Sequence, residues 1–268
     1  AGYNSSDGSV FTFNINERNF LGKGQTVKLD LSTSKIEKQT AIGFEDPSYL
    51  GRNLFAGISF GQTTSTPNSN PLKTDKLYFV PKIGFPLSRD SNLSIKYTFD
   101  REDVKLTQDP LLVSPQIRAD VGQKTRSALT FIYDLDKTNS VVTPTSGFDF
   151  NITQEFNGLG GDISYSQSQL NFKTYKTILR DDIILSSGLS SGIIVGSDAS
   201  IVNRFTLGGD RLKGFRNQGI GPYDSTYASH LGGKMYTSLS LEASFPIGVP
   251  EEYGIFGGLF LDTGSLWG

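Results

Sequence analysis

One short stretch of this chain has the residue types and spacing of a covalent catalyst. The run Gly57–Gly61 (GISFG) fits the G-x-S-x-G pattern, in which a nucleophilic serine sits on a strained turn between a strand and a helix. Here Ser59 instead alternates with apolar neighbours, as in the middle of a strand, and no helical pattern follows. His230 is the only histidine that could serve as a base, and its neighbours Ser229 and Gly232 indicate a loop. The sequence therefore predicts no catalytic residue and no enzyme.

Binding chemistry based on metals, phosphate or nucleic acid has equally little support. The run Gly22–Thr26 (GKGQT) lacks the spacing of a phosphate-binding loop, so we interpret it as a turn. With one histidine and no cysteine, the chain offers neither a disulfide nor a thiolate metal site. Its net charge of −2 indicates no basic surface for nucleic acid. We therefore expect no metal, no cofactor and no nucleic-acid partner.

Apolar and polar residues alternate along most of the chain, which is typical of β-strands with one apolar and one polar face. Between Leu93 and Phe99, for example, apolar residues occupy every second position. We expect about twelve strands, near residues 9–17, 25–33, 36–45, 53–61, 76–85, 91–101, 123–135, 147–156, 163–175, 183–195, 235–245 and 254–263. No helical pattern of useful length occurs, so the predicted fold class is all-β.

The strands favour a membrane-spanning barrel over a soluble β-protein, which is the alternative. A transmembrane strand needs only about 10 residues, and half of them can face a wet lumen, so a mean hydropathy of −0.25 is compatible with a barrel. Long strands without a domain break, with polar faces rich in serine, threonine and asparagine, favour the barrel. Short and long connections alternate, and the one near 196–234 is longer than a connection requires, so we expect it to have a function.

Five motifs rich in glycine and proline punctuate the strands. They are the turn Asn19–Gly24 (NFLGKG), the strand ending Asp46–Tyr49 (DPSY), Asp136-Lys137 followed by Pro144–Gly147 (PTSG), the loop residues Gly208, Gly209, Lys213, Gly214, Phe215, Gly221 and Pro222, and the F-x-D-x-G residues Phe260, Asp262 and Gly264. Each motif alone is weak. In this order, over nearly the whole chain, they resemble the barrel of the BamA-type outer-membrane-protein assembly factors.

The resemblance implies a transmembrane antiparallel β-barrel, which has sixteen strands in this family, with the long loop near 196–234 folded into the lumen. It also implies that the family's POTRA domains and last strands lie outside residues 1–268, so that this chain is one partial barrel domain. In the family, an arginine at the loop tip contacts acidic residues of the lumen wall. This chain has Lys213 there, and lysine lacks the planar two-pronged fork of arginine.

The strand pattern itself predicts an acidic inner wall near the C-terminus. Leu259 and Leu261 are expected to face lipid, so Phe260 and Asp262 of the same strand point into the lumen. By the same alternation, Glu242 points inward from the neighbouring strand. Two carboxylates on adjacent strands are costly if they remain unpaired. The wall therefore requires a cation.

The loop tip supplies that cation in our prediction. We expect Lys213 to contact Asp262 and Glu242, with Phe215 packed beside it and the loop glycines letting the backbone lie close to the wall. The other loop cations that could share this contact are Arg211 and Arg216.

The resemblance further implies a protein that assembles other membrane proteins without covalent chemistry. An incoming strand would pair with an edge strand of the barrel while the barrel perturbs the bilayer. The expected partners are outer-membrane lipid, unfolded β-barrel substrate proteins and accessory lipoproteins of an assembly complex. We expect a bacterial outer membrane, with an organellar outer membrane as the alternative. Other open functions are a TamA-like translocator, a two-partner secretion transporter and a passive porin.

Overall fold

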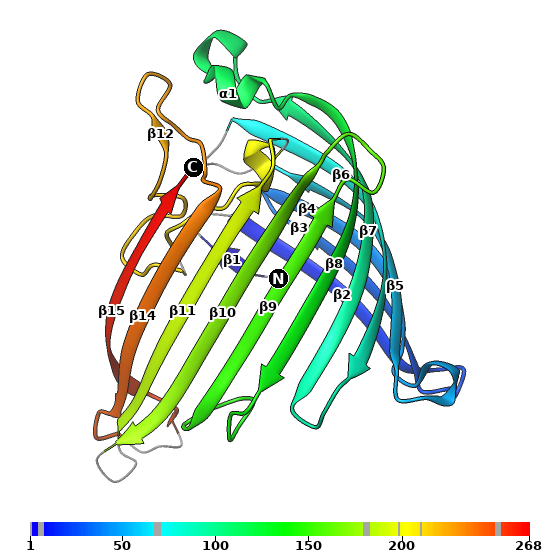
Figure 1. The fold of residues 1–268 in the computed structure, drawn as a ribbon, viewed down its shortest axis with the longest axis vertical. Coiled ribbons are helices and arrows are strands. Elements are labelled where there is room, and N and C mark those ends of the chain that lie inside the picture. The colour runs from blue at the N-terminus through cyan, green and yellow to red at the C-terminus, as the bar shows by residue number, and fades with distance from the viewer. Residues whose placement is uncertain are drawn as a thin grey trace.

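The computed structural model describes residues 2–4, 8–66, 71–178, 183–197, 199–209, 211–249 and 253–268. In these residues thirteen strands form one antiparallel sheet, and each strand pairs with its neighbours in chain order. The order steps from β11 to β14 because the long connection between them carries a separate two-stranded ribbon, β12–β13. Figure 1 shows the sheet as a curved wall, with the blue strands at the back and the green-to-orange strands in front.

Most strands of the sheet are longer than the ~5–6 residues that are typical of ordinary globular domains. They are β1 (Gly2–Asn4), β2 (Gly8–Phe20), β3 (Gln25–Thr33), β4 (Glu37–Asp46), β5 (Phe55–Ser65), β6 (Leu72–Pro86), β7 (Ser91–Leu106), β8 (Gly122–Asp136), β9 (Gly147–Asn157), β10 (Tyr165–Ile178), β11 (Ile183–Val195), β14 (Met235–Pro246) and β15 (Phe256–Trp267). The ribbon consists of β12 (Tyr223–Asp224) and β13 (Ser229–His230). The helical segments are η1 (Tyr49–Gly51), η2 (Pro110–Leu112), α1 (Pro115–Arg118) and η3 (Ile201–Asn203).

The predicted all-β antiparallel fold is confirmed, and each of the twelve predicted strands is present. Several strands extend beyond the prediction: β6 begins at Leu72 and β7 ends at Leu106, and these two ends pair with each other. The added residues are mostly charged, so the apolar alternation that reveals a strand is weak there. The helix α1 has only four residues, too few to leave a periodic signal.

Antiparallel pairing places successive connections at opposite ends of the wall. We call the end with the β2–β3, β4–β5, β6–β7, β8–β9 and β14–β15 connections the turn end. The opposite end, which carries the β7–β8 and β11–β14 connections, is the loop end. Helix α1 lies at the loop end, above the strands in Figure 1.

The outer face of the wall is apolar and exposed. On β15, Leu259 and Leu261 are 68% and 66% exposed, and on β14 Leu239 and Leu241 are also exposed. A water-soluble sandwich would bury such a face in its core, whereas strands that face lipid leave it uncovered. This pattern favours the membrane barrel over the soluble alternative.

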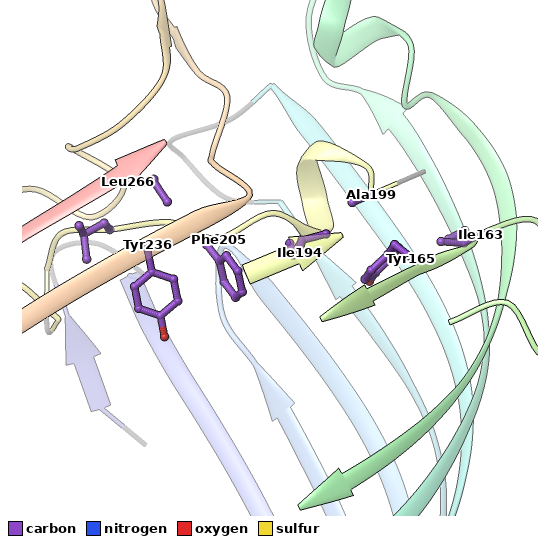
Figure 2. Packing of buried hydrophobic residues seen from close by; sticks show 8 residues of the cluster. Ile163, Tyr165, Ile194, Ala199, Phe205, Tyr236 and Leu266 are labelled. Carbon is purple, nitrogen blue, oxygen red and sulfur yellow. The ribbon is translucent and has the colours of Figure 1, made fainter. Parts of the chain in front are cut away.

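Apolar packing is concentrated in two clusters. The inner cluster consists of Ile163, Tyr165, Ile194, Ala199, Phe205, Leu207, Tyr236 and Leu266, most of which Figure 2 labels. The loop-end cluster consists of Leu72, Val104, Val113, Ile117, Ile201 and Leu231. Both clusters contain residues of the β11–β14 connection, so this long loop is packed into the fold at two places.

A buried charge network joins the inner faces of β7, β8 and β9. The Arg126 guanidinium lies 2.7 Å from a carboxylate oxygen of Asp100 and 3.0 Å from one of Glu155. Asp100 is 1% exposed. The hydroxyl of Thr130 donates a hydrogen bond to the second oxygen of Glu155, at 3.3 Å. Because one cation serves two carboxylates, the network depends on Arg126.

Replacing Arg126 with methionine is therefore expected to destabilise the wall by about 3–5 kcal/mol, since it leaves the buried carboxylate of Asp100 and the partly buried carboxylate of Glu155 without their cation. Urea unfolding of the protein in detergent micelles measures this loss. The matched control is Arg101→Met, because Arg101 is exposed and, among the described residues, its side chain bonds only to Gln123. We expect the control to change stability by less than about 0.5 kcal/mol. Equal effects of the two substitutions would contradict the network's role.

Candidate functional site

The long β11–β14 connection folds back on itself and lies against the inner face of the wall. Isolated β-bridges join Phe205 to Gly233 and Leu207 to Ile220, so the outgoing and returning halves run side by side. Leu207 is fully buried and Phe205 is 5% exposed. The tip of the loop thereby reaches the strands β14 and β15.

Lys213, at this tip, brings together the three wall residues named from the sequence. Its backbone N–H donates a hydrogen bond to Asp262 Oδ2 at 2.9 Å, and its ammonium lies 2.5 Å from Glu242 Oε2. The same ammonium lies 4.9 Å from the centre of the Phe260 ring. Glu242 and Phe260 are directly paired across β14 and β15. A single residue of the loop thus contacts two neighbouring strands through its backbone and its side chain.

The ion pair of this contact is partly exposed to solvent, as expected on the inner wall of a water-filled barrel. The side chains of Lys213 and Glu242 are 40% and 42% exposed, so their ion pair contributes only about 0.2–1 kcal/mol by itself. Asp262 differs, since its Oδ1 is buried and, among the described residues, has no hydrogen-bond partner. The contact therefore positions the loop rather than supplying most of its stability, which comes from the two apolar clusters.

Two glycines of the site allow parts of the chain to approach each other closely. Gly208 has a φ of +127°, and a Cβ at this position would lie 2.0 Å from the backbone oxygen of Arg216. At Gly264, on β15, a Cβ would lie 3.1 Å from the side chains of both Leu207 and Leu212. The first glycine lets the loop cross itself, and the second lets the buried leucines of the loop approach the wall.

The other loop residues predicted from the sequence lie at the same tip or in the half of the loop that leads back to β14. The N–H of Gly209 donates to the oxygen of Phe215 at 3.0 Å, and Gly214 has a φ of +85°. A Cβ at Gly221 would lie 2.5 Å from Leu266, and the oxygen of Pro222 accepts a hydrogen bond from the N–H of Leu231. Asp210 lies outside the described residues.

The ring beside the Lys213 ammonium is Phe260 of the wall, whereas the sequence had suggested Phe215. Phe215 is 52% exposed, because the chain reverses at Gly214 immediately before it. Arg211 places its guanidinium 5.2 Å from the ring centre of Tyr236. Arg211 also lines a cavity of about 270 Å³ between the loop tip and the wall, together with Lys213 and Asp262.

An aromatic pair that the sequence did not reveal fixes the base of the loop. The rings of Phe205 and Tyr236 meet edge to face, with centres 4.7 Å apart. The Tyr236 hydroxyl also bonds to the Ser190 hydroxyl at 2.8 Å. The only available signal was Gly192, a glycine inside β11, since a Cβ there would lie 2.5 Å from Tyr236. Phe205 therefore docks where the strand has no side chain.

The residues considered for covalent or metal chemistry are scattered. Ser59 lies inside β5, with no helix after it. The ring of His230 lies 4.9 Å from the ring of Tyr223, centre to centre, in the β12–β13 ribbon. Within the described ranges, no group of three or more potential metal ligands occurs. No described helix is long and apolar enough to cross a bilayer. The Lys213 contact is thus the most developed candidate site.

Known proteins resemble this chain over most of its length. The model of the Omp85 superfamily domain matches residues 19–268. The outer membrane protein assembly factor BamA of Neorickettsia risticii is 23% identical over all of this chain, which covers 36% of that protein. The sorting and assembly machinery component 50 homolog of Mus musculus is 28% identical over 92% of this chain, which covers 54% of that protein. The chain thus spans between about a third and a half of these relatives.

Solved structures show the same fold. BamA from Haemophilus ducreyi, solved without POTRA domains 1–3, superposes with a TM-score of 0.86 at 18% identity, over 99% of this chain and 56% of that one. CdiB from Acinetobacter baumannii superposes less closely, with a TM-score of 0.60 at 14% identity, over 99% of this chain and 48% of that one.

Proposed function

Because this chain belongs to the Omp85 superfamily, we propose that it forms most of the barrel wall of a protein that folds and inserts β-barrel proteins into an outer membrane. Relatives from a bacterium and a mouse, which align with most or all of the chain, carry names that denote assembly. The observation that carries the proposal is the inward loop, which Lys213 holds against Glu242 and Asp262.

The proposed mechanism is non-covalent templating. A strand entering a bilayer must pair all its backbone N–H and C=O groups, since hydrocarbon offers no other partner. An edge strand of the barrel can provide those partners while the substrate folds, and the free energy comes from the substrate's own folding. By the resemblance to the family, Gly2–Asn4 would border the working seam. The inward loop would brace the wall at β14 and β15, so that the seam can open without collapse of the barrel.

The proposed partners are outer-membrane lipid, unfolded β-barrel proteins and accessory lipoproteins of an assembly complex. We propose a bacterial outer membrane as the location. The bacterial assembly factor aligns with the entire chain and the mouse relative with 92% of it, and an organellar outer membrane is the alternative. Cell fractionation of the source organism tests this assignment. Recovery of the protein with an organellar membrane would contradict it.

A translocator is the second candidate, because the fold also matches CdiB with a TM-score of 0.60. A porin is less compatible with the loop, which presents a basic tip to an acidic wall, the reverse of the usual constriction.

Reconstitution distinguishes these functions. The full-length protein is placed in liposomes, and an unfolded outer-membrane barrel is added in urea and diluted. We expect the substrate to become protected from protease at least tenfold faster than in empty liposomes, because insertion would be catalysed. No acceleration together with steady ion conductance would contradict the assembly function and favour a pore or translocator.

A further inference from the structure

Three consecutive turns at the turn end share a pattern that the assembly function does not explain. The β2–β3 turn contains Leu21-Gly22-Lys23, the β4–β5 turn contains Leu50-Gly51-Arg52, and the β6–β7 turn contains Leu87-Ser88-Arg89. In each turn an apolar residue is followed two positions later by a cation. Because antiparallel pairing puts all three turns at one end, the pattern forms a rim of alternating leucines and cations.

The leucines of this rim are exposed without any packing that would account for them. Leu21, Leu50 and Leu87 are 76%, 74% and 57% exposed. At the same end, the β8–β9 turn exposes Val141 and Val142 at 88% each. Single exposed apolar residues are ordinary, but a series of them along one end of a molecule marks a surface that meets lipid or a partner.

Backbone strain shows that two of these leucines are not incidental turn residues. Leu21 has a φ of +53° and Leu50 a φ of +57°, in the left-handed region that glycine and asparagine tolerate and branched apolar side chains do not. Neither side chain packs against the protein to offset that strain, since each is about three-quarters exposed. A contact outside the chain would offset it.

The cations of the rim are also free of protein partners. Lys23, Arg52 and Arg89 are exposed and, within the described part of the chain, form no ion pair or hydrogen bond through their side chains. The carboxylate of Asp46 is occupied by Gln25 and by the N–H of Ser48.

Further acidic groups at this end are arranged as follows. The Asp136 carboxylate accepts two hydrogen bonds from Thr138, and Glu17 accepts one from the N–H of Asn19. Asp90 adjoins Arg89 in the chain. Most of these carboxylates therefore accept hydrogen bonds from nearby residues, whereas the three cations are exposed to solvent.

From this arrangement we infer that the turn end is a membrane-docking rim. Leu21, Leu50 and Leu87 insert into the leaflet that meets this end, and Lys23, Arg52 and Arg89 bind the phosphates of its anionic phospholipids. The inference rests on the proposed placement of the barrel in a bilayer. It adds to that placement a set of lipid contacts that fix how deep the wall lies in the bilayer and how far it tilts. A leucine in the acyl region and a cation two residues later match the vertical order of acyl chain and phosphate in a leaflet.

Insertion of the leucines can be measured with a single introduced cysteine. Residues 1–268 contain no cysteine, and any cysteine elsewhere in the full-length protein is first replaced with serine. Full-length protein with a single bimane-labelled cysteine, Leu21→Cys or Leu50→Cys, is reconstituted in vesicles of brominated phosphatidylcholine. We expect quenching close to that of Leu259→Cys on the lipid-facing wall and well above that of Gln116→Cys on α1. Quenching no greater than at Gln116 would overturn the insertion.

Asparagine substitutions separate a lipid contact from a mere turn. Asparagine relieves left-handed strain, so Leu21→Asn with Leu50→Asn should leave the protein equally or more stable if both side chains meet only water. We expect the opposite in vesicles: a fall of about tenfold per leucine in the folding equilibrium constant, measured by urea titration. The matched control is Leu111→Asn, since Leu111 is 78% exposed at the loop end and is expected to change nothing.

The cations give an independent readout. The triple variant Lys23→Gln, Arg52→Gln, Arg89→Gln is expected to lower the folding equilibrium constant about a hundredfold in vesicles containing one-third phosphatidylglycerol. It should have no effect in pure phosphatidylcholine, and salt should reduce the difference. Equal behaviour of wild type and triple variant in both vesicles would overturn the lipid assignment and would reassign the rim to a protein partner. The rate of substrate assembly is measured in a separate experiment. If the rim variants show no lipid contact, the proposed function is therefore unaffected. If the wild-type protein does not enter vesicles, the placement of the barrel in a bilayer is itself contradicted.

Discussion

Replacing Lys213 with glutamate is expected to slow substrate assembly by about tenfold or more, because it puts a third carboxylate beside Glu242 and Asp262. At this solvent-exposed site the substitution replaces a weak attraction with a repulsion of similar size, roughly 1–2 kcal/mol in all, which shifts the balance between the docked and released loop by about tenfold. The clusters around Phe205 and Ile201 would still hold the base of the loop, so the wall should fold. Assembly rates in liposomes and protease sensitivity of the loop tip measure the two consequences.

Charge exchange provides the decisive control for this prediction. The double variant Lys213→Glu with Glu242→Lys restores an attractive pair and is expected to recover most of the lost rate, which either single substitution alone should not. Arg216→Glu is the matched control, since its side chain forms no ion pair among the described residues. A double variant as slow as Lys213→Glu would show that the contact between loop and wall does not govern assembly.

Adding a single methyl group at Gly208 is expected to have the second large effect. Gly208→Ala places a Cβ 2.0 Å from the Arg216 backbone oxygen, in a backbone conformation that alanine rarely adopts. Since backbone cannot move aside as a flexible side chain can, the crossing of the two loop halves must open. We expect a loss of about 3 kcal/mol or more in urea unfolding, together with faster proteolysis between Phe205 and Gly233.

Gly214→Ala separates steric conflict from backbone strain. Gly214 also has a positive φ, +85°, but a Cβ there would meet no atom within 4 Å. The Gly214→Ala substitution should therefore lower the free energy of unfolding only by the cost of backbone strain, about 1–2 kcal/mol, and the loop should stay protected from protease. Equal losses at the two glycines would contradict the close crossing at Gly208.

Much of the site could be predicted from the sequence because its wall is regular. Alternation around Leu259 and Leu261 assigned the directions of Phe260 and Asp262, and the cross-strand pairing of Glu242 with Phe260 brought the carboxylates to one face. The packing of Phe215 beside Lys213 stays a prediction, whereas the ring found next to the Lys213 ammonium is Phe260. Periodicity does not determine the path of the loop after Gly214, which depends on packing.

Other features left no usable sequence signal. The network around Arg126 joins β7, β8 and β9, and its two carboxylates lie 26 and 29 residues from Arg126 in the chain. Charged residues facing a lumen look like any polar strand face, so neither Asp100 nor Glu155 could be selected in advance. The leucines in left-handed conformation at positions 21 and 50 were equally invisible, because each turn motif is compatible with several backbone conformations.

The amino-acid sequence by itself determined the strands, the apolar outer face and the acidic inner wall at Glu242 and Asp262. It could do so because side-chain direction along a strand repeats every two residues and is therefore a local property. Only the tertiary structure decided which groups meet that wall. The position of Lys213 depends on the docking of Phe205 against Tyr236 and on the crossing at Gly208, and such contacts between distant residues are selected by packing and close approach across the whole fold.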